Sequence, residues 1–181
     1  MLFVDGFNVY HSLNDSFNLH QFKWLNYAAL GRLFLNPGES LLKTYFFTAY
    51  TPWDQHKHNR HETYVSVLKA HGVEPVVGSF RQRTRDCKMC QSQFVVNEEK
   101  ETDVNIAVYM LTRAHKDAYD VAFLLTGDSD QVPTIKAVRV MGKAVRTIIP
   151  VNRNSDQLKK VSNAYHKLDT GHLLTDVSHL V

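Results

Sequence analysis

The stretch YDVAFLLTGDSD, residues 119–130, decides the fold. Its apolar part, VAFLL, has the length and composition of a buried strand, so a strand is predicted over residues 119–126. Asp128 and Asp130 follow directly, and helical spacing resumes over residues 132–141. The stretch therefore predicts a strand that leads into a helix, with two carboxylates at the junction.

The same alternation of strand and helix patterns runs along the whole chain. Further strands are predicted at residues 2–5, 41–50, 73–80 and 144–149, and further helices at residues 7–13, 25–35, 54–71, 102–114 and 156–161. Residues 81–100 are polar and are expected to be irregular, with a hairpin through residues 94–96 as the alternative. This order predicts βαβ units, an α/β fold and a mostly parallel sheet with helices on both faces. Without a linker, one domain is expected over residues 1–181, with a core at about 1–150 and a tail at 151–181.

The clearest helical pattern is that of residues 102–114. Its core stripe is predicted to consist of Val104, Ala107, Val108 and Leu111. Thr102 is the predicted N-cap, because a threonine hydroxyl can accept a hydrogen bond from the first turn. Asp103 would then lie where the positive end of the helix dipole favours a carboxylate.

Four aspartates stand at strand ends or helix starts: Asp5, Asp103, Asp128 and Asp130. In an open parallel sheet these positions converge on the crevice beyond the carboxyl ends of the strands. Two carboxylates about 4 Å apart repel by roughly 4 kcal/mol at an effective dielectric constant of about 20. The cluster is therefore expected to take up protons or to bind a cation. Each aspartate also has a structural alternative, because Asp103 or Asp130 can cap a helix and Asp5 can belong to a turn.

Such a cluster indicates phosphate chemistry. Hydrolysis of a phosphodiester needs stabilised attacking and leaving oxygens, which two divalent ions about 3.5–4 Å apart can provide. Aspartate oxygens suit Mg²⁺ or Mn²⁺. Neither an HExxH motif nor a dense group of histidines and cysteines surrounds the aspartates, so catalytic zinc is less expected. Glu98, Glu99 and Glu101 are candidates for an additional ligand or a general base, or for a solvated entry to the helix that follows.

Composition places the chain among ordinary globular proteins, since 44% of its residues are hydrophobic and 22% are charged. The sequence has no run of about 20 apolar residues, so neither a membrane-spanning helix nor a membrane partner is expected. The N-terminus lacks the pattern of a signal peptide. The expected location is therefore the cytoplasm.

The distribution of charge points to an anionic partner more clearly than the net charge of +3 does. Arg81, Arg83, Arg85 and Lys88 lie within eight residues, opposed there only by Asp86. Such a stretch suits contacts with phosphates, although a solvated loop has the same composition.

The only two cysteines, Cys87 and Cys90, form the pattern CKMC. A disulfide framework is not supported in a chain of this size without a secretion signal. The spacing is that of a zinc knuckle, and a structural Zn²⁺ site would need two more ligands. His56, His58 and His61 are candidates, and so is a second CxxC from another subunit of a homo-oligomer. The alternative is a pair of reduced thiols on a polar loop.

Four segments of the chain resemble the NYN-domain family, which belongs to the PIN-like nuclease superfamily. The segments are FVDGFNVYHSL at residues 3–13, EEKETDVNIAVYML at 98–111, YDVAFLLTGDSDQVPTI at 119–135 and GKAVRTIIP at 142–150. The resemblance covers roughly residues 1–150. It implies a three-layer α/β/α fold of the PIN-like type, with an acidic, metal-binding crevice that acts on RNA through Mg²⁺ or Mn²⁺.

By motif, the resemblance assigns site roles to Asp5, Asn8, Asp103, Thr126, Asp128 and Asp130. The four aspartates would bind the metal and carry catalysis, while Asn8 and Thr126 would contact the substrate. Asn8 has the alternative of tying Asp5 in place, and Thr126 that of a backbone contact. Gln131 stands where an apolar residue is expected, and should alter packing or the rim of the pocket.

The function implied by this resemblance is that of a metal-dependent ribonuclease acting on single-stranded or structured RNA. Arg81, Arg83 and Arg85 are then expected to hold the RNA backbone, with His11 and Trp53 among the candidates for stacking on bases. The alternative is a non-catalytic RNA-binding or regulatory module with a structural or vestigial metal site. A phosphatase of the haloacid-dehalogenase type is disfavoured, because Phe7 occupies the position where that chemistry needs a second aspartate.

Overall fold

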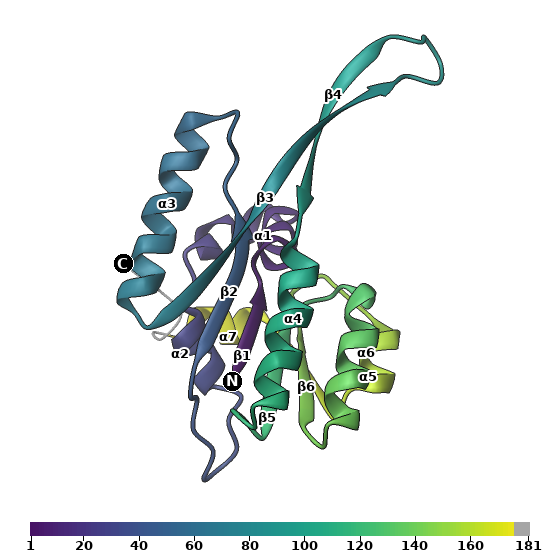
Figure 1. Cartoon of the computed structure of the whole chain (residues 1–181). Coiled ribbons are helices and arrows are strands. Elements are labelled where there is room, and N and C mark those ends of the chain that lie inside the picture. The colour runs from purple at the N-terminus through teal and green to yellow at the C-terminus, as the bar shows by residue number, and fades with distance from the viewer. Residues whose placement is uncertain (176–181) are drawn as a thin grey trace.

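The apolar runs of the sequence form one seven-stranded sheet in the computed structural model, which describes residues 1–175 apart from the side chain of Phe17. The strands are β1 (Leu2–Asp5), β2 (Thr44–Ala49), β3 (Val73–Asp86), β4 (Gln93–Lys100), β5 (Val121–Leu125), β6 (Ala144–Ile149) and β7 (Ala164–Lys167). They lie in the order β4-β3-β2-β1-β5-β6-β7 (Figure 1). Neighbouring strands are parallel except β3 and β4, which are antiparallel.

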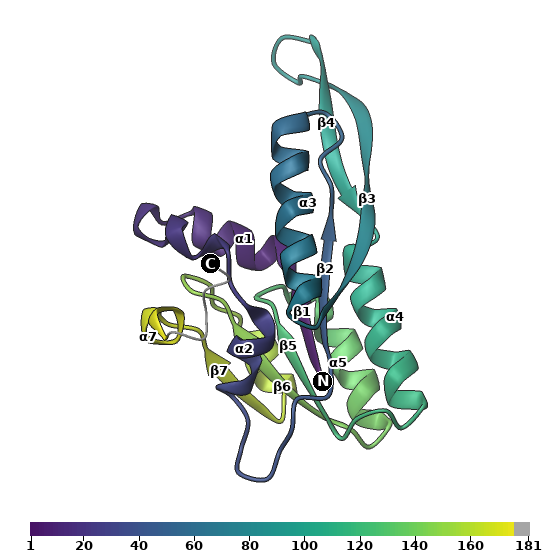
Figure 2. The same ribbon diagram turned by 90° about the vertical axis from the view of Figure 1, so that its left-hand side faces the viewer.

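Helices cover both faces of this sheet (Figures 1 and 2). They are α1 (Gly6–Asn14), α2 (Tyr27–Arg32), α3 (Gln55–Ala70), α4 (Thr102–His115), α5 (Val132–Val140), α6 (Asp156–Val161) and α7 (Thr170–Leu174), with 3₁₀ turns η1 (Phe17–Lys23) and η2 (Ser129–Gln131). Because side chains alternate along a strand, Leu2 and Val4 pack with α1, α2 and α3, whereas Phe3 packs with α4, α5 and α6. The predicted three-layer α/β/α fold with a mostly parallel sheet is confirmed.

The entry into α1 shows how tightly the first layer lies on the sheet. Gly6 follows β1 directly, and a Cβ atom at this position would lie 2.6 Å from the carbonyl oxygen of Phe47 and 2.7 Å from the ring of Phe46. A larger residue would push α1 away from β2. The glycine therefore allows the chain to turn into a helix immediately beyond Asp5.

One segment predicted to be irregular is regular. Residues 81–86 extend β3, and β4 pairs with it to form a hairpin that projects from the body (Figures 1 and 2). We call residues 81–98 the arm. The alternative of a hairpin through residues 94–96 is therefore borne out. Both faces of the arm are largely exposed, so no alternation of apolar and polar residues marks it in the sequence.

The core stripe predicted for α4 is wrong at Val104 and Val108, whereas Leu111 does pack against the core. Val104 and Val108 are 65% and 50% exposed, whereas Ile106 and Met110 are fully buried. Two stripes at helical spacing compete in this segment, and the sheet covers the one that contains isoleucine and methionine.

The predicted cap of α4 is also wrong. Thr102 is the first residue of the helix, and the N-cap position belongs to Glu101, which has a φ of 80°. This left-handed residue turns the chain sharply from β4 into α4. Thr102 instead donates its backbone N–H to Glu99 Oε1 over 3.1 Å, and its hydroxyl donates to the same oxygen.

The segment after residue 150 adds to the sheet. α6 has the bounds predicted from the sequence, and β7 pairs in parallel with β6 at the sheet edge. Residues 176–181 of the expected tail lie outside the described residues. No helix within residues 1–175 has the length and apolarity needed to cross a membrane.

Candidate metal centre

A cavity of about 290 Å³ opens at the carboxyl ends of β1 and β5. Asp5 ends β1 and caps α1, Asp103 lies in the first turn of α4, and Asp128 caps η2 just after β5. All three aspartates line the cavity. Its other walls come from Phe7, Asn8, His11, Glu99, Thr102 and Arg153. Side chains far apart in the sequence thus meet in one hollow, as the strand-end positions predict.

Asp5 is the buried member of this group, with 4% of its surface exposed. Its Oδ1 accepts a hydrogen bond from the Asn8 backbone N–H at 3.0 Å, and its Oδ2 accepts one from the Thr126 hydroxyl at 2.8 Å. Burial, with a smaller contribution from the charges of Asp103 and Asp128, raises the pKa of Asp5 to about 6 against the effect of these two bonds. The Asp5 carboxylate is therefore held in position in surroundings that disfavour its charge.

Thr126 connects Asp5 to Asp128. It is fully buried, and its hydroxyl oxygen accepts a hydrogen bond from the Asp128 backbone N–H at 3.1 Å while donating to Asp5. One hydroxyl thus sets the distance between the end of β1 and the start of η2.

Asn8 holds the same turn from the other side. Its Oδ1 accepts a hydrogen bond from the Gly127 N–H at 2.8 Å. A Cβ atom on Gly127 would lie 3.2 Å from this oxygen and 3.0 Å from Arg153 Cβ, so a side chain there would push both neighbours away. The Asn8 side chain therefore fixes the turn, and its backbone contacts Asp5.

Asp103 is held by Gln131, the residue that stands where an apolar one is expected. Gln131 is 1% exposed, and its Nε2 donates to Asp103 Oδ1 at 3.3 Å and to the Asp103 carbonyl at 3.4 Å. Partial burial raises the pKa of Asp103, followed by the charge of Asp128, while the Gln131 bond lowers it. Gln131 Oε1 is buried without a hydrogen-bond partner. The buried Gln131 side chain thus orients the Asp103 carboxylate.

Asp130 lies next to the cavity and does not line it. It is exposed, and its backbone N–H donates to Asp128 Oδ1 at 2.9 Å. Its negative charge contributes to the raised pKa of Asp103. Of the four predicted aspartates, three therefore share the cavity and the fourth stands beside it.

Sequence reasoning missed Arg153, which lines the cavity from the loop after β6. Its Nη2 lies 2.7 Å from Asp15 Oδ2, so the residue that caps the end of α1 anchors the guanidinium. Its position in the sequence could have indicated this, because a residue shortly after a parallel strand lies at the same sheet edge as the aspartates. Glu99 reaches the cavity as well, which the sequence left open.

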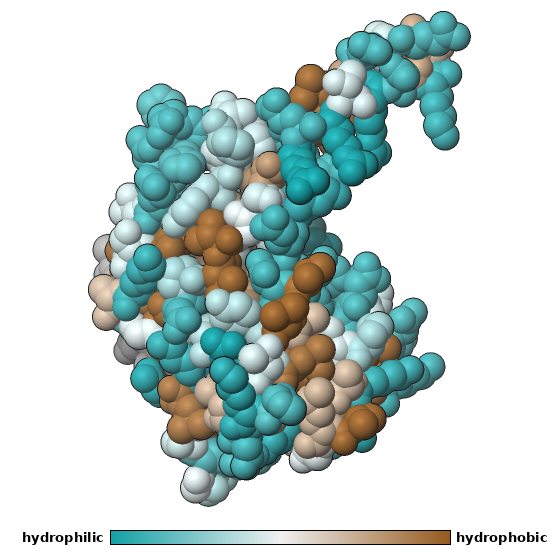
Figure 3. All heavy atoms as spheres, viewed as in Figure 1, coloured by the Kyte–Doolittle hydropathy of each residue, from teal (hydrophilic) through white to brown (hydrophobic). Residues whose placement is uncertain are grey.

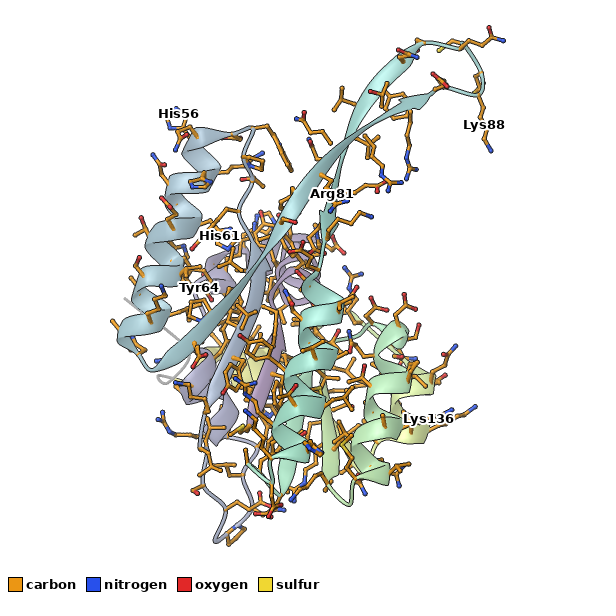
Figure 4. The ribbon with its side chains drawn as sticks, viewed as in Figure 1. His56, His61, Tyr64, Arg81, Lys88 and Lys136 are labelled. Atoms are coloured by element: carbon orange, nitrogen blue, oxygen red, sulfur yellow. The ribbon has the colours of Figure 1, made fainter. Side chains whose placement is uncertain are left out.

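The basic residues Arg81, Arg83 and Arg85 lie on the arm and not in the cavity lining. Arg83 and Arg85 pair with Glu98 on the neighbouring strand. Arg81 lies at the base of the arm (Figure 4). Their predicted contact with RNA would therefore be made by strands of RNA that extend beyond the cavity.

An aromatic series leads from the cavity wall towards the base of the arm. The ring of Phe7 meets Phe80 of β3 edge-on at 5.6 Å, and Phe80 meets Trp53 edge-on at 4.9 Å. Trp53 is 42% exposed, and His11, beside Phe7, lines the cavity. His11 therefore presents a ring in the cavity lining, and Trp53 presents an exposed ring at the far end of the aromatic series.

The donor set suits a hard divalent cation. Carboxylate oxygens are the ligands that Mg²⁺ and Mn²⁺ prefer, and the repulsion among Asp5, Asp103 and Asp128 would be relieved by a positive ion. Within residues 1–175, no three or more His, Cys, Asp or Glu side chains are already drawn together as a metal site. Coordination would therefore require these side chains to move towards the ion.

The cysteines stand apart from this cavity, at the tip of the arm, which Lys88 marks in Figure 4. The histidines proposed as their partners lie on α3, where His56 and His61 are well separated from the tip (Figure 4). Because α3 packs on the body and the arm projects from it, these candidate histidines do not lie beside the cysteines. Cys87 and Cys90 remain a pair of free thiols in one chain.

Comparisons with known proteins agree with the fold and with the ordered motifs. The NYN domain model matches residues 1–169, which takes in α6 and β7. A crystal structure of a protein of unknown function, VPA0982 from Vibrio parahaemolyticus RIMD 2210633, superimposes with a TM-score of 0.68 and 17% sequence identity, over 93% of this chain and 91% of that one. At this identity the likeness is one of fold. No curated protein matches the chain.

Proposed function

The chain belongs to the NYN-domain family, part of the PIN-like nuclease superfamily, and from that membership we propose that it is a Mg²⁺- or Mn²⁺-dependent ribonuclease. The observation that carries the proposal is the convergence of Asp5, Asp103 and Asp128 from three separate elements on one cavity. Burial, and after it the mutual repulsion of these carboxylates, raises the pKa of Asp5 and Asp103, and a bound cation would relieve the repulsion. The proposal includes a cytoplasmic location, which the two free thiols support.

In this proposal Asp5, Asp103 and Asp128 hold the metal, and Asp130 adds negative charge beside them. A divalent cation bound there supplies Lewis-acid stabilisation of the charge that develops on a phosphate during hydrolysis. Thr126 and Gln131 are positioning residues, because each donates a hydrogen bond to one of the carboxylates.

The substrate would approach along positively charged and aromatic surfaces. Arg153 is the cation of the cavity wall and is placed to bind a phosphate of the RNA. Ring faces of His11 and Trp53 would stack on bases of a single-stranded or unpaired segment. Arg81, Arg83 and Arg85 would contact backbone phosphates further along the strand.

The test is cleavage of single-stranded, structured and double-stranded RNA in Mg²⁺, in Mn²⁺ and in EDTA. Wild type should cleave only with metal, and Asp128→Asn should lower the rate by roughly a hundredfold or more, because one carboxylate of the cavity is lost. Asp120→Asn is the matched control, since this aspartate is fully exposed and outside the cavity lining. Cleavage by Asp128→Asn at the wild-type rate would disprove the assignment.

The second candidate is a non-catalytic RNA-binding module. The observation that favours it is the arm, which offers exposed arginines that would hold RNA without any reaction in the cavity. This candidate predicts that the protein retains RNA but cleaves none of the three substrates in either metal. Turnover that co-purifies with the protein and is lost in Asp128→Asn would exclude it.

A further inference from the structure

We propose that the arm tips of two copies of this chain meet and bind one zinc ion through Cys87 and Cys90 of each copy. The site lies outside the cavity and does not depend on the ribonuclease proposal. Zinc in structural sites takes four ligands in a tetrahedron, and thiolates are among its preferred ligands. One copy of the chain offers half of such a set.

The turn that carries the cysteines is closed on itself. The Cys87 N–H donates to the Ser92 carbonyl at 2.8 Å, and the Gln91 N–H donates to the Cys87 carbonyl at 2.8 Å. Gln91, directly after Cys90, has a φ of 58°, a left-handed conformation that folds the chain back after the second cysteine. The backbone is therefore bent around the CxxC segment.

The thiols are on the same side of this turn. Cys90 Sγ lies 2.9 Å from Ser92 Oγ, and the interactions of this thiol with Ser92 and, after it, with Cys87 lower its pKa to about 7. Both cysteines can thus reach one ion without a change in the path of the backbone.

The missing ligands are not available within one copy. Within residues 1–175, no three His, Cys, Asp or Glu side chains lie close enough together to hold a metal ion as they stand. The histidines of α3 are distant from the tip (Figure 4). A second copy related by a two-fold axis brings an identical pair of thiols to the first, because such an interface places the same surface on both sides.

The shape of the molecule allows this contact. The arm extends beyond both the body and α3 in two perpendicular views, so two tips can meet without collision between the bodies (Figures 1 and 2). Figure 3 shows the arm as a mainly hydrophilic projection with a few hydrophobic side chains. Met89, Phe94 and Val95 are 96%, 48% and 60% exposed, and a second arm would cover them.

The local charge also fits. Four thiolates around one Zn²⁺ leave a net negative charge, and Lys88, between the two cysteines, places one ammonium per copy beside it. Each thiol releases its proton to solvent as it binds the metal. The reaction involves no oxidant, so it is compatible with reduced cysteines.

The experiment uses the full chain, stripped of metal and kept in a non-thiol reductant. Zn²⁺ is added, and the mass in solution is measured by light scattering together with the zinc content per chain. The expected result is a zinc-dependent dimer with one zinc ion for every two chains, which EDTA returns to monomer. Co²⁺ in place of zinc should give the absorption of tetrahedral thiolate coordination.

The double variant Cys87→Ser/Cys90→Ser should stay monomeric with zinc while its circular dichroism matches wild type, since both positions lie outside the buried clusters. Gln91→Gly is the matched control, because glycine accepts the left-handed conformation and should keep the dimer. One zinc per chain in a monomer, no zinc bound, or a dimer that persists without zinc or without the cysteines would each overturn the proposal.

Discussion

Asp5 illustrates how much a single buried carboxylate changes the energetics of this protein. The charge is desolvated at the end of β1, and the two hydrogen bonds from Asn8 and Thr126 do not fully compensate for the lost water. The group is therefore easier to protonate in the folded chain than in the unfolded one. Its raised folded-state pKa links the acidic cavity to the stability of the whole domain.

The first prediction concerns the stability of Asp5→Asn without metal. The pKa of Asp5 rises from 3.8 to about 6 on folding, so the folded chain binds the Asp5 proton more tightly than the unfolded chain does. The gain in free energy of unfolding from this proton is complete below pH 3.8 and is lost as pH rises through about 6. A shift of about two pKa units means that ionised Asp5 costs the folded chain about 3 kcal/mol. In EDTA at pH 8, Asp5→Asn should therefore exceed wild type in free energy of unfolding by about 1–2 kcal/mol, since its amide replaces only part of the hydrogen bonding.

Urea denaturation at pH 8 and at pH 5 measures this difference. The advantage of Asp5→Asn should shrink at pH 5, where wild type carries a proton on Asp5. Added Mg²⁺ should stabilise wild type and narrow the gap at pH 8, because a ligand that binds the folded state stabilises it. A variant less stable than wild type at pH 8, or a difference independent of pH, would contradict the account.

At the scale of the element, α4 shows why helical spacing alone does not identify the buried face. Val104 and Val108 form one stripe and Ile106 and Met110 another, and both fit a helix. The chain leaves β4 through the left-handed Glu101, and in the helix that follows the second stripe faces the sheet. Asp103, in the first turn of the same helix, lines the cavity.

The second prediction compares two apolar truncations on α4. Ile106→Ala removes a fully buried side chain and should lower the free energy of unfolding by about 2–4 kcal/mol. Val108→Ala changes a side chain that is half exposed and should stay within about 0.5 kcal/mol of wild type. Chemical denaturation of both variants is the measurement, and equal losses would mean that the helix faces the sheet differently.

The arm is an element of another kind, because its stability comes from pairing and not from burial. Arg83, Arg85 and Lys100 surround Glu98 on one face of the hairpin. Exposed ion pairs of this sort contribute little each. The arm therefore holds its shape through the backbone ladder between β3 and β4, and its tip is free to take part in other contacts.

For the whole molecule, the order of the strands decides where the site lies. The chain builds outward from β1 to β2, β3 and β4, then crosses back to place β5 on the other side of β1. Such a reversal opens a crevice beyond the carboxyl ends of the two central strands. Asp5 and Asp128 stand at the two sides of that opening.

The third prediction is that the body folds without the arm. Residues 82–97 are replaced by Asn-Gly, which joins the paired positions Arg81 and Glu98 by a two-residue turn. The two hydrophobic core clusters described within residues 1–175 contain no residue of the arm. The melting temperature should therefore change by only a few degrees. Thermal denaturation tests this, and a molten or unfolded product would show that the arm supports the body.

The same replacement separates the two proposals. It removes Cys87 and Cys90, so the zinc-dependent dimer should be lost, while Glu99 and the three cavity aspartates remain in place. RNA binding should weaken as Arg83 and Arg85 are removed.

The sequence by itself determined the alternation of strands and helices, the α/β class and the positions of Asp5, Asp103 and Asp128 at strand ends or a helix start. These features are local, because apolar periodicity and the ends of apolar segments depend only on residues that are close in the sequence. Only the tertiary structure decided which face of α4 is buried, that the arm is a hairpin, and that Arg153 and Gln131 reach the aspartates. Those outcomes depend on how elements distant in the chain pack against one another, and no local pattern carries that information.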